Sequence, residues 1–103
     1  MSKKRTIQLV CVAEFFAFEG KTDALIDALY RLMEPTHQEA GCLRYELNQR
    51  QDDPRWITFI EKWADQKTFE EHCATPYIAN FFNVQRPDLV EKFEVKLYRE
   101  ILP

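Results

Sequence analysis

Hydrophobic and polar positions alternate along four stretches of the chain. Residues 6–17 alternate with both sets largely apolar, which is typical of a strand covered on two sides. Residues 42–50 and 56–63 also alternate, and the turn-forming QDDPR stretch at 51–55 predicts that they form a hairpin. Residues 92–101 alternate once more. We therefore expect four strands.

Between the first two alternating stretches, the apolar residues recur at helical spacing. Leucines three and four positions apart predict a helix from Thr22, with Thr22 or Asp23 as its cap and Gly41 as its end. Pro35 lies inside this segment and removes a backbone donor. We expect a kink at Pro35, or a helix that restarts there.

A second helical region precedes the last strand. Asp65 predicts the N-cap of a short helix that runs to about Cys73. Thr75 followed by Pro76 is a favoured pair of N-cap and first helical residue, so a further helical segment should begin there. Residues 84–90 (VQRPDLV) predict an irregular end to this segment.

The resulting order is β-α-β-β-α(α)-β within one predicted domain, residues 1–103, in which residues 1–5 form a disordered basic tail. A four-stranded antiparallel sheet with helices on one face, the ferredoxin-like α+β fold, satisfies this order. The other sheet face remains uncovered although it carries apolar side chains. We expect it to form a homodimer, sheet against sheet.

Composition excludes several classes of protein. A net charge of −3 and a pI near 5.4 argue against a nucleic-acid-binding surface, and no stretch reaches the ~20 apolar residues of a membrane-spanning helix. Three cysteines about thirty positions apart predict reduced thiols in a cytoplasmic protein. No Cys, His and carboxylate spacing typical of a metal site is present, so we expect no metal.

Four short motifs, taken together in this order, resemble the signature of the antibiotic biosynthesis monooxygenase domain family. They are EAGCLRY at 39–45, DDP at 52–54, EKW at 61–63 and HCATPY at 72–77. The resemblance extends from about residue 7 to residue 101. It implies a dimeric α+β barrel with one pocket in each subunit, between the sheet and the helices.

The family resemblance also suggests candidate catalytic residues. His72 could take a proton from a phenolic substrate near neutral pH, or it could be a structural histidine at the helix junction. Many relatives carry a second histidine where this chain has Tyr77, whose hydroxyl could replace it. Glu61 is either a buried acid–base group or, as we prefer, part of a salt bridge at the dimer interface. We interpret His37 as a solvated histidine at a helix end.

Aromatic residues around His72 could form an apolar pocket for a flat aromatic molecule. Core packing is the alternative, and it should hold for at least one of the adjacent phenylalanines 81 and 82. The candidate binding residues are Trp63, Phe69, Asn80, Phe81 and Phe82, with Tyr77 beside them.

The predicted function is that of a monooxygenase without a cofactor, acting on a small aromatic or hydroquinone-like molecule. Two alternatives remain: an isomerase or degrading enzyme for a small signal metabolite, and a non-catalytic ligand-binding or stress-response module. Haem-degrading relatives, which are distant, use an Asn on the first strand and a histidine that binds the haem iron. The first strand here has no Asn, and the residue ten positions after His72 is Phe82, which cannot bind iron, so haem degradation is excluded.

Overall fold

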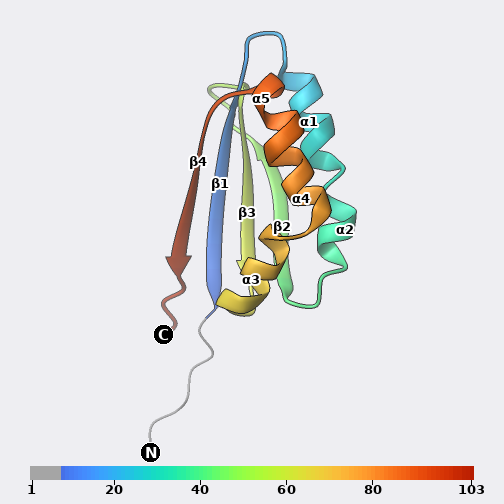
Figure 1. Cartoon of the computed structure of the whole chain (residues 1–103). Coiled ribbons are helices and arrows are strands. Elements are labelled where there is room, and N and C mark those ends of the chain that lie inside the picture. The colour runs from blue at the N-terminus through green and yellow to red at the C-terminus, as the bar shows by residue number, and fades with distance from the viewer. Residues whose placement is uncertain (1–7) are drawn as a thin grey trace, which may run out of the picture.

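The computed structural model describes residues 8–103, and the predicted basic tail lies outside this range. Four antiparallel strands form one sheet in the order β2-β3-β1-β4. Helices lie against one face of this sheet (Figure 1). The predicted ferredoxin-like α+β fold is therefore confirmed. The strands are β1 (Leu9–Ala17), β2 (Cys42–Gln49), β3 (Trp56–Trp63) and β4 (Val90–Arg99).

The helices form two groups, one before the β2–β3 hairpin and one after it. Within residues 8–103, none of them is long and apolar enough to cross a bilayer. The first group is α1 (Thr22–Tyr30) and α2 (Met33–His37). The second group is α3 (Gln66–Cys73), α4 (Pro76–Asn80), the π-helix η1 (Phe81–Gln85) and α5 (Arg86–Leu89).

The helix predicted from residue 22 to residue 41 is in fact two helices. This agrees with the expectation that the helix kinks or restarts at Pro35. The second helix begins at Met33, so Pro35 lies in its first turn, where a backbone N–H has no partner to lose. The predicted side-chain cap by Thr22 or Asp23 is wrong. Lys21 is the N-cap and makes no side-chain cap hydrogen bond.

Gly41 was expected to end this helical region, but α2 already ends at His37 and Gly41 lacks a left-handed backbone conformation. The glycine is required for another reason. A Cβ at this position would overlap the side chain of Thr68 in the first turn of α3. The loop before β2 can therefore approach α3 closely only because residue 41 has no side chain.

Both predicted starts in the second helical region are confirmed. The carboxylate of Asp65 accepts a hydrogen bond from the backbone N–H of Thr68 at 2.8 Å, and the Thr68 hydroxyl accepts one from the backbone N–H of Asp65 at 3.3 Å. This reciprocal capping box fixes the beginning of α3. Thr75 is the N-cap of α4 and Pro76 its first residue.

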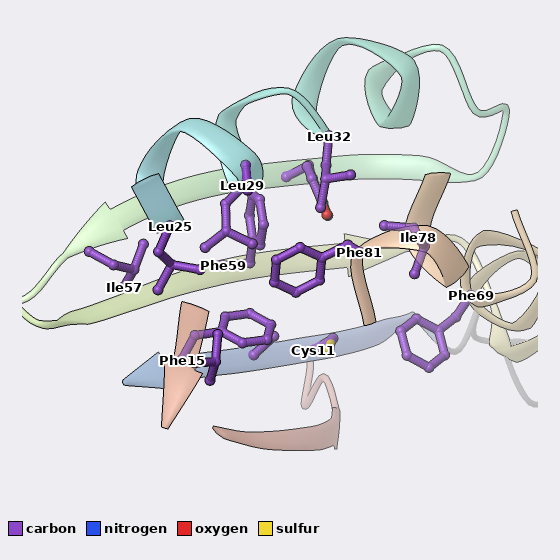
Figure 2. Packing of buried hydrophobic residues seen from close by; sticks show 14 of the residues in the cluster. Cys11, Phe15, Leu25, Leu29, Leu32, Ile57, Phe59, Phe69, Ile78 and Phe81 are labelled. Carbon is purple, nitrogen blue, oxygen red and sulfur yellow. The ribbon is translucent and has the colours of Figure 1, made fainter. Parts of the chain in front are cut away.

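The core lies between the helices and the inner face of the sheet (Figure 2). Alternate residues of β1 and β3 point into it, as their patterns predicted. In β2 the pattern is interrupted by a β-bulge between Cys42 and Arg44, because Cys42 pairs with Trp63 and Arg44 with Lys62. Strict alternation over residues 42–50 would place Leu43 on the same face as buried Tyr45, but Leu43 is 51% exposed.

The edge strand β4 carries apolar residues on the core side that the helices cover only in part. Phe93, Val95 and Leu97 pair with Phe15, Ala13 and Cys11, which belong to the buried face of β1. All three β4 residues are nevertheless exposed. The core layer is thus open along the β4 side of the sheet.

Candidate active site

A cavity of about 110 Å³ lies between the inner face of the sheet and the helices. Its wall is almost entirely apolar, and among residues 8–103 only Glu61 and His72 bring an acidic or imidazole side chain to it. The aromatic part of the wall comes from Phe15, Tyr45, Phe59, Phe69, Phe81 and Phe82. Such a wall suits a small apolar molecule that has one polar group.

His72 lies in the last turn of α3 and is only 3% exposed. Its ring is packed against Trp63, with 4.4 Å between the ring centres, and its Nδ1 lies 2.9 Å from Oε2 of Glu39. Burial lowers the pKa of His72, although the hydrogen bond with Glu39 opposes this effect. The neutral ring then donates from Nδ1, and Nε2 has no hydrogen-bond partner among residues 8–103.

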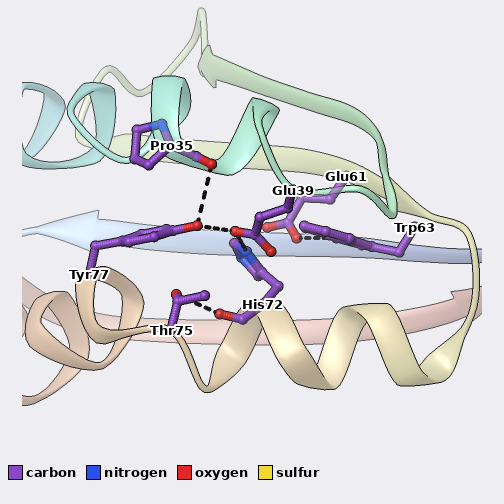
Figure 3. A network of polar contacts seen from close by, with 7 residues as sticks. All are labelled: Pro35, Glu39, Glu61, Trp63, His72, Thr75 and Tyr77. Atoms are coloured by element: carbon purple, nitrogen blue, oxygen red, sulfur yellow. Dashed lines mark hydrogen bonds and ion pairs between the residues drawn. The ribbon is translucent and has the colours of Figure 1, made fainter.

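Glu39 also binds Tyr77, so one carboxylate joins two candidate catalytic residues (Figure 3). The Tyr77 hydroxyl donates to Oε2 of Glu39, and the backbone carbonyl of Pro35 lies 3.4 Å from it. Burial, followed by the hydrogen bond to Glu39, raises the pKa of Tyr77 to about 12. Tyr77 does not line the cavity, and its contacts are those of a residue that positions Glu39.

Glu61 faces the helices, which corrects the preferred interpretation of this residue as part of an interface salt bridge. The odd-numbered residues of β3 are those that enter the core, so the Glu61 side chain lines the cavity and is only 4% exposed. Burial raises its pKa to about 7, despite opposing hydrogen bonds from Trp63 and Cys11. The Trp63 indole N–H donates to Oε1 of Glu61 at 2.9 Å. Glu61 can therefore give or take a proton near neutral pH.

Phe69, Phe81 and Phe82 line the cavity, where the sequence analysis expected pocket residues. Phe81 is fully buried and packs edge-on against Phe15, at 5.5 Å between ring centres, so one of the two adjacent phenylalanines is a core residue as expected. Both rings reach the cavity because they begin the π-helix η1. Its wider turn separates successive side chains by a smaller angle than an α-helix does.

Two predicted binding residues do not line the cavity. Trp63 is fully buried behind Glu61 and acts on the site through its hydrogen bond to that carboxylate. Asn80 is exposed on α4, whose inner face presents Ile78 to the cavity, so its position gives no support to a binding role. His37 is exposed at the end of α2, as predicted, and its Nε2 lies 3.0 Å from the backbone oxygen of Tyr45.

Sequence reasoning gave no role to Glu39, although this residue is the acidic position of the EAGCLRY motif. The available signal was its place in that motif, two residues before Gly41. The other missed residues belong to the cavity wall, and nothing in the sequence distinguishes them from core positions: Cys11, Ala13, Phe15, Leu29, Leu32, Tyr45, Phe59, Cys73, Ile78 and Val95.

Comparison with known proteins agrees with this architecture. Sequences of the family described as Antibiotic biosynthesis monooxygenase match residues 8–84. A crystal structure of a protein from Shewanella oneidensis is 50% identical, has a TM-score of 0.91 and covers 95% of each chain. A crystal structure described as an antibiotic biosynthesis monooxygenase is 29% identical, with a TM-score of 0.82, over 92% of this chain and 99% of that one.

Two more distant relatives extend the comparison. A crystal structure of a Pseudomonas aeruginosa protein is 27% identical, with a TM-score of 0.89, over 97% of this chain and all of that one. A curated relative from Synechocystis sp. is 29% identical over 80 residues, which make up 77% of this chain. The match spans only 54% of that relative's length.

Proposed function

Because this chain belongs to the antibiotic biosynthesis monooxygenase family, we propose that it is a monooxygenase that needs no cofactor and oxidises a small phenol or hydroquinone with O₂. One observation carries the proposal. On the wall of an apolar cavity, His72 has its Nδ1 bound by Glu39 and its Nε2 free of protein partners within residues 8–103. An imidazole held in this way is a general base for a molecule that enters the cavity.

The first step is proton transfer. Nε2 of His72 takes the phenolic proton, and the carboxylate of Glu39 stabilises the imidazolium that forms. The phenolate is electron-rich and loses its hydration in the apolar cavity, which favours the transfer of one electron to O₂. The two radicals then combine at a ring carbon that carries hydrogen, which gives a peroxide anion.

The second half of the reaction returns the protons. The imidazolium of His72 protonates the peroxide, and the neutral ring then removes the hydrogen of the same carbon as a proton. The O–O bond breaks, and the carboxylic acid of Glu61 supplies the proton that turns the leaving hydroxide into water. Glu61 recovers its proton from His72. One oxygen atom becomes a quinone carbonyl and the other becomes water, and the phenol supplies all four electrons that O₂ accepts.

Oxygen consumption with a panel of phenols and hydroquinones tests this proposal, together with ¹⁸O₂ labelling of the product. We expect one labelled atom in the quinone, and a loss of turnover in His72→Gln by at least a hundredfold. His37→Gln is the matched control, since His37 is exposed on α2 and lies outside the cavity. Unchanged turnover in His72→Gln, or a product without the label, would contradict the mechanism.

An isomerase is the second candidate, because the cavity holds a base and a group that titrates near pH 7. His72 and Glu61 could move a proton from one carbon of a small oxygenated metabolite to another. Such a reaction consumes no O₂ and exchanges substrate hydrogen with D₂O. A ligand that raises the melting temperature without being converted would instead support a non-catalytic binding module.

We further propose that two copies form a homodimer through the outer sheet face, and that the protein is cytoplasmic because its three cysteines are free thiols. No helix within residues 8–103 covers this face (Figure 1). Val10, Val12 and Ile60 are apolar residues on this face, and Val12 pairs with Ile60 across β1 and β3. Charged pairs lie beside them, Lys62 with Glu100 at 3.0 Å and Lys96 with Glu14 at 3.7 Å. Protein interfaces combine apolar contacts with polar ones in this way.

A further inference from the structure

We propose that the substrate is a molecule with a single aromatic ring, whose polar groups are hydroxyls and whose other substituents are small and apolar. This inference rests on the proposed function for the role of the hydroxyl. It extends that function, because it excludes two- and three-ring phenols and phenols that carry an acidic group. Three features of the cavity support it: its volume, the position of its mouth and the charge of its wall.

The volume of the cavity sets the size of the ring system. The cavity measures about 110 Å³, whereas an engineered apolar cavity of about 150 Å³ in another protein holds one benzene molecule. Leu29 and Leu32 close it on the helix side, and Phe59 closes it on the sheet side. All three residues are buried in the core. The cavity therefore has room for no more than one ring.

The mouth of the cavity lies on the β4 side. Val95, the β4 residue in the cavity wall, is 41% exposed, and Cys73 and Phe82 of the wall are at least partly exposed as well. A second fused ring would have to lie in this mouth, in contact with water on its outer side. A methyl or similar apolar group on a single ring would instead contact Phe82 and Val95.

The charge of the wall excludes an acidic substituent. Within residues 8–103 no lysine or arginine lines the cavity, and burial disfavours the cationic form of His72 by lowering its pKa. A carboxylate on the ring would lose its hydration without gaining a cationic partner. It would also face Glu61, which carries a negative charge in part of the molecules near pH 7. A hydroxyl, by contrast, can donate to Nε2 of His72.

Binding measured without oxygen separates this inference from the reaction. We would titrate the protein anaerobically by calorimetry with 4-methylphenol, 4-hydroxybenzoate, 2-naphthol and a three-ring anthrol. We expect 4-methylphenol to bind at least tenfold more tightly than each of the others. The comparison is stringent, because the larger ring systems are more hydrophobic and would bind more tightly to an open apolar surface.

A wider mouth should relax this selectivity. Phe82→Ala removes a ring from the wall, and we expect it to tighten 2-naphthol binding at least tenfold, with Phe82→Leu giving a smaller gain. Val84→Ala is the matched control, since Val84 lies on the same π-helix, is 60% exposed and does not line the cavity. It should leave the binding of all four ligands unchanged.

Each outcome is decisive. Tighter binding of 2-naphthol, the anthrol or 4-hydroxybenzoate than of 4-methylphenol by the wild-type protein overturns the inference, and so does a lack of binding by 4-methylphenol. If larger phenols bind better and are oxidised, the proposed function stands while the limit to one ring fails. If 4-methylphenol binds with the expected preference but the protein consumes no O₂ with any single-ring phenol, the limit to one ring stands and the proposed monooxygenase function fails.

Discussion

Nδ1 of His72 lies 2.9 Å from Oε2 of Glu39, although the two residues are 33 positions apart in the sequence. The contact joins the last turn of α3 to the loop between α2 and β2. Tyr77 donates to the same carboxylate oxygen from the first turn of α4. Glu39 thus sets the orientation of the imidazole, and the free nitrogen of that ring is the one available to a ligand in the cavity.

We expect Glu39→Gln to reduce kcat about 10–100-fold, because a glutamine amide holds the imidazole less well and stabilises its charged form less. The pH profile provides a second measurement. Glu39 raises the pKa of His72, so its removal should move the acidic limb of kcat/KM to lower pH. Tyr77→Phe keeps the carboxylate and should have a smaller effect on both. If the acidic limb of kcat/KM did not move in Glu39→Gln, the contact with Glu39 would have no effect on the pKa of His72.

Glu61→Gln should alter the pH dependence of stability. The pKa of Glu61 rises from 4.5 to about 7 on folding, so between these values the folded state holds a proton that the unfolded state has released. The free energy of unfolding of the wild type therefore loses a contribution of about 3 kcal/mol as pH rises from 4.5 to 7. Relative to the wild type, Glu61→Gln should gain this amount between pH 4.5 and pH 8.

Urea denaturation at several pH values measures this difference, and the comparison with the wild type cancels the contributions of other groups. Glu71→Gln, at an exposed position on α3, is the control and should show a nearly constant offset. A constant offset for Glu61→Gln as well would mean that the Glu61 carboxylate titrates in the folded protein as it does in water.

Gly41→Ala should destabilise the protein by about 1–3 kcal/mol, because overpacking displaces neighbouring groups. The new Cβ would overlap Thr68, whose hydroxyl takes part in the capping box of α3. His72 lies on the same helix, so ligand binding should weaken too. Thermal and urea denaturation measure the loss. Ala40→Ser, at an exposed neighbouring position, serves as the control, and equal stabilities of the two variants would refute the close-approach role.

Asp65→Ala should reduce stability by about 1 kcal/mol, since it removes the acceptor of the backbone N–H of Thr68. The neighbouring exposed residue Gln66 provides the comparison, and Gln66→Ala should change stability by less. Chemical denaturation is the measurement. If Asp65→Ala were as stable as the wild type, the start of α3 would be held by its packing alone.

Val12→Asp tests the proposed homodimer. Val12 lies on the outer face of the central strand β1, opposite Ile60 and Lys96, so a carboxylate there would be buried between two sheets without its water shell. Light scattering at micromolar concentration should give a dimer for the wild type and a monomer for Val12→Asp. Tyr30→Asp, on the exposed side of α1, should remain dimeric. A monomeric wild type would refute the proposal.

The sequence was sufficient for the strands because alternation specifies which side chains share a face. It placed Glu61 and Trp63 on one side of β3, together with Ile57 and Phe59. It did not specify which side met the helices, since the opposite side of the strand also carries the apolar residues Trp56 and Ile60. The choice between core and interface for Glu61 depended on how the helices pack, and alternation alone does not contain that information.

The missed features share a different cause. Glu39 acts from a loop, where no periodicity shows the direction of a side chain, and its partner His72 is distant in sequence. The bulge that turns Leu43 outward and the π-helix that begins at Phe81 each break a regular period locally. Such breaks arise from pairing and packing with other elements, so a single stretch of sequence does not reveal them.

The position of β4 also bears on how molecules enter and leave. This strand is bonded to the rest of the sheet through β1 alone, and its Val95 forms part of the cavity wall. A terminal strand of this kind opens more readily than the layers behind it. The wall nearest the solvent is therefore part of an edge strand, so in a single copy the passage of ligand and product is limited by the β1–β4 hydrogen bonds and by the packing of Phe93 against Phe15 and Phe82.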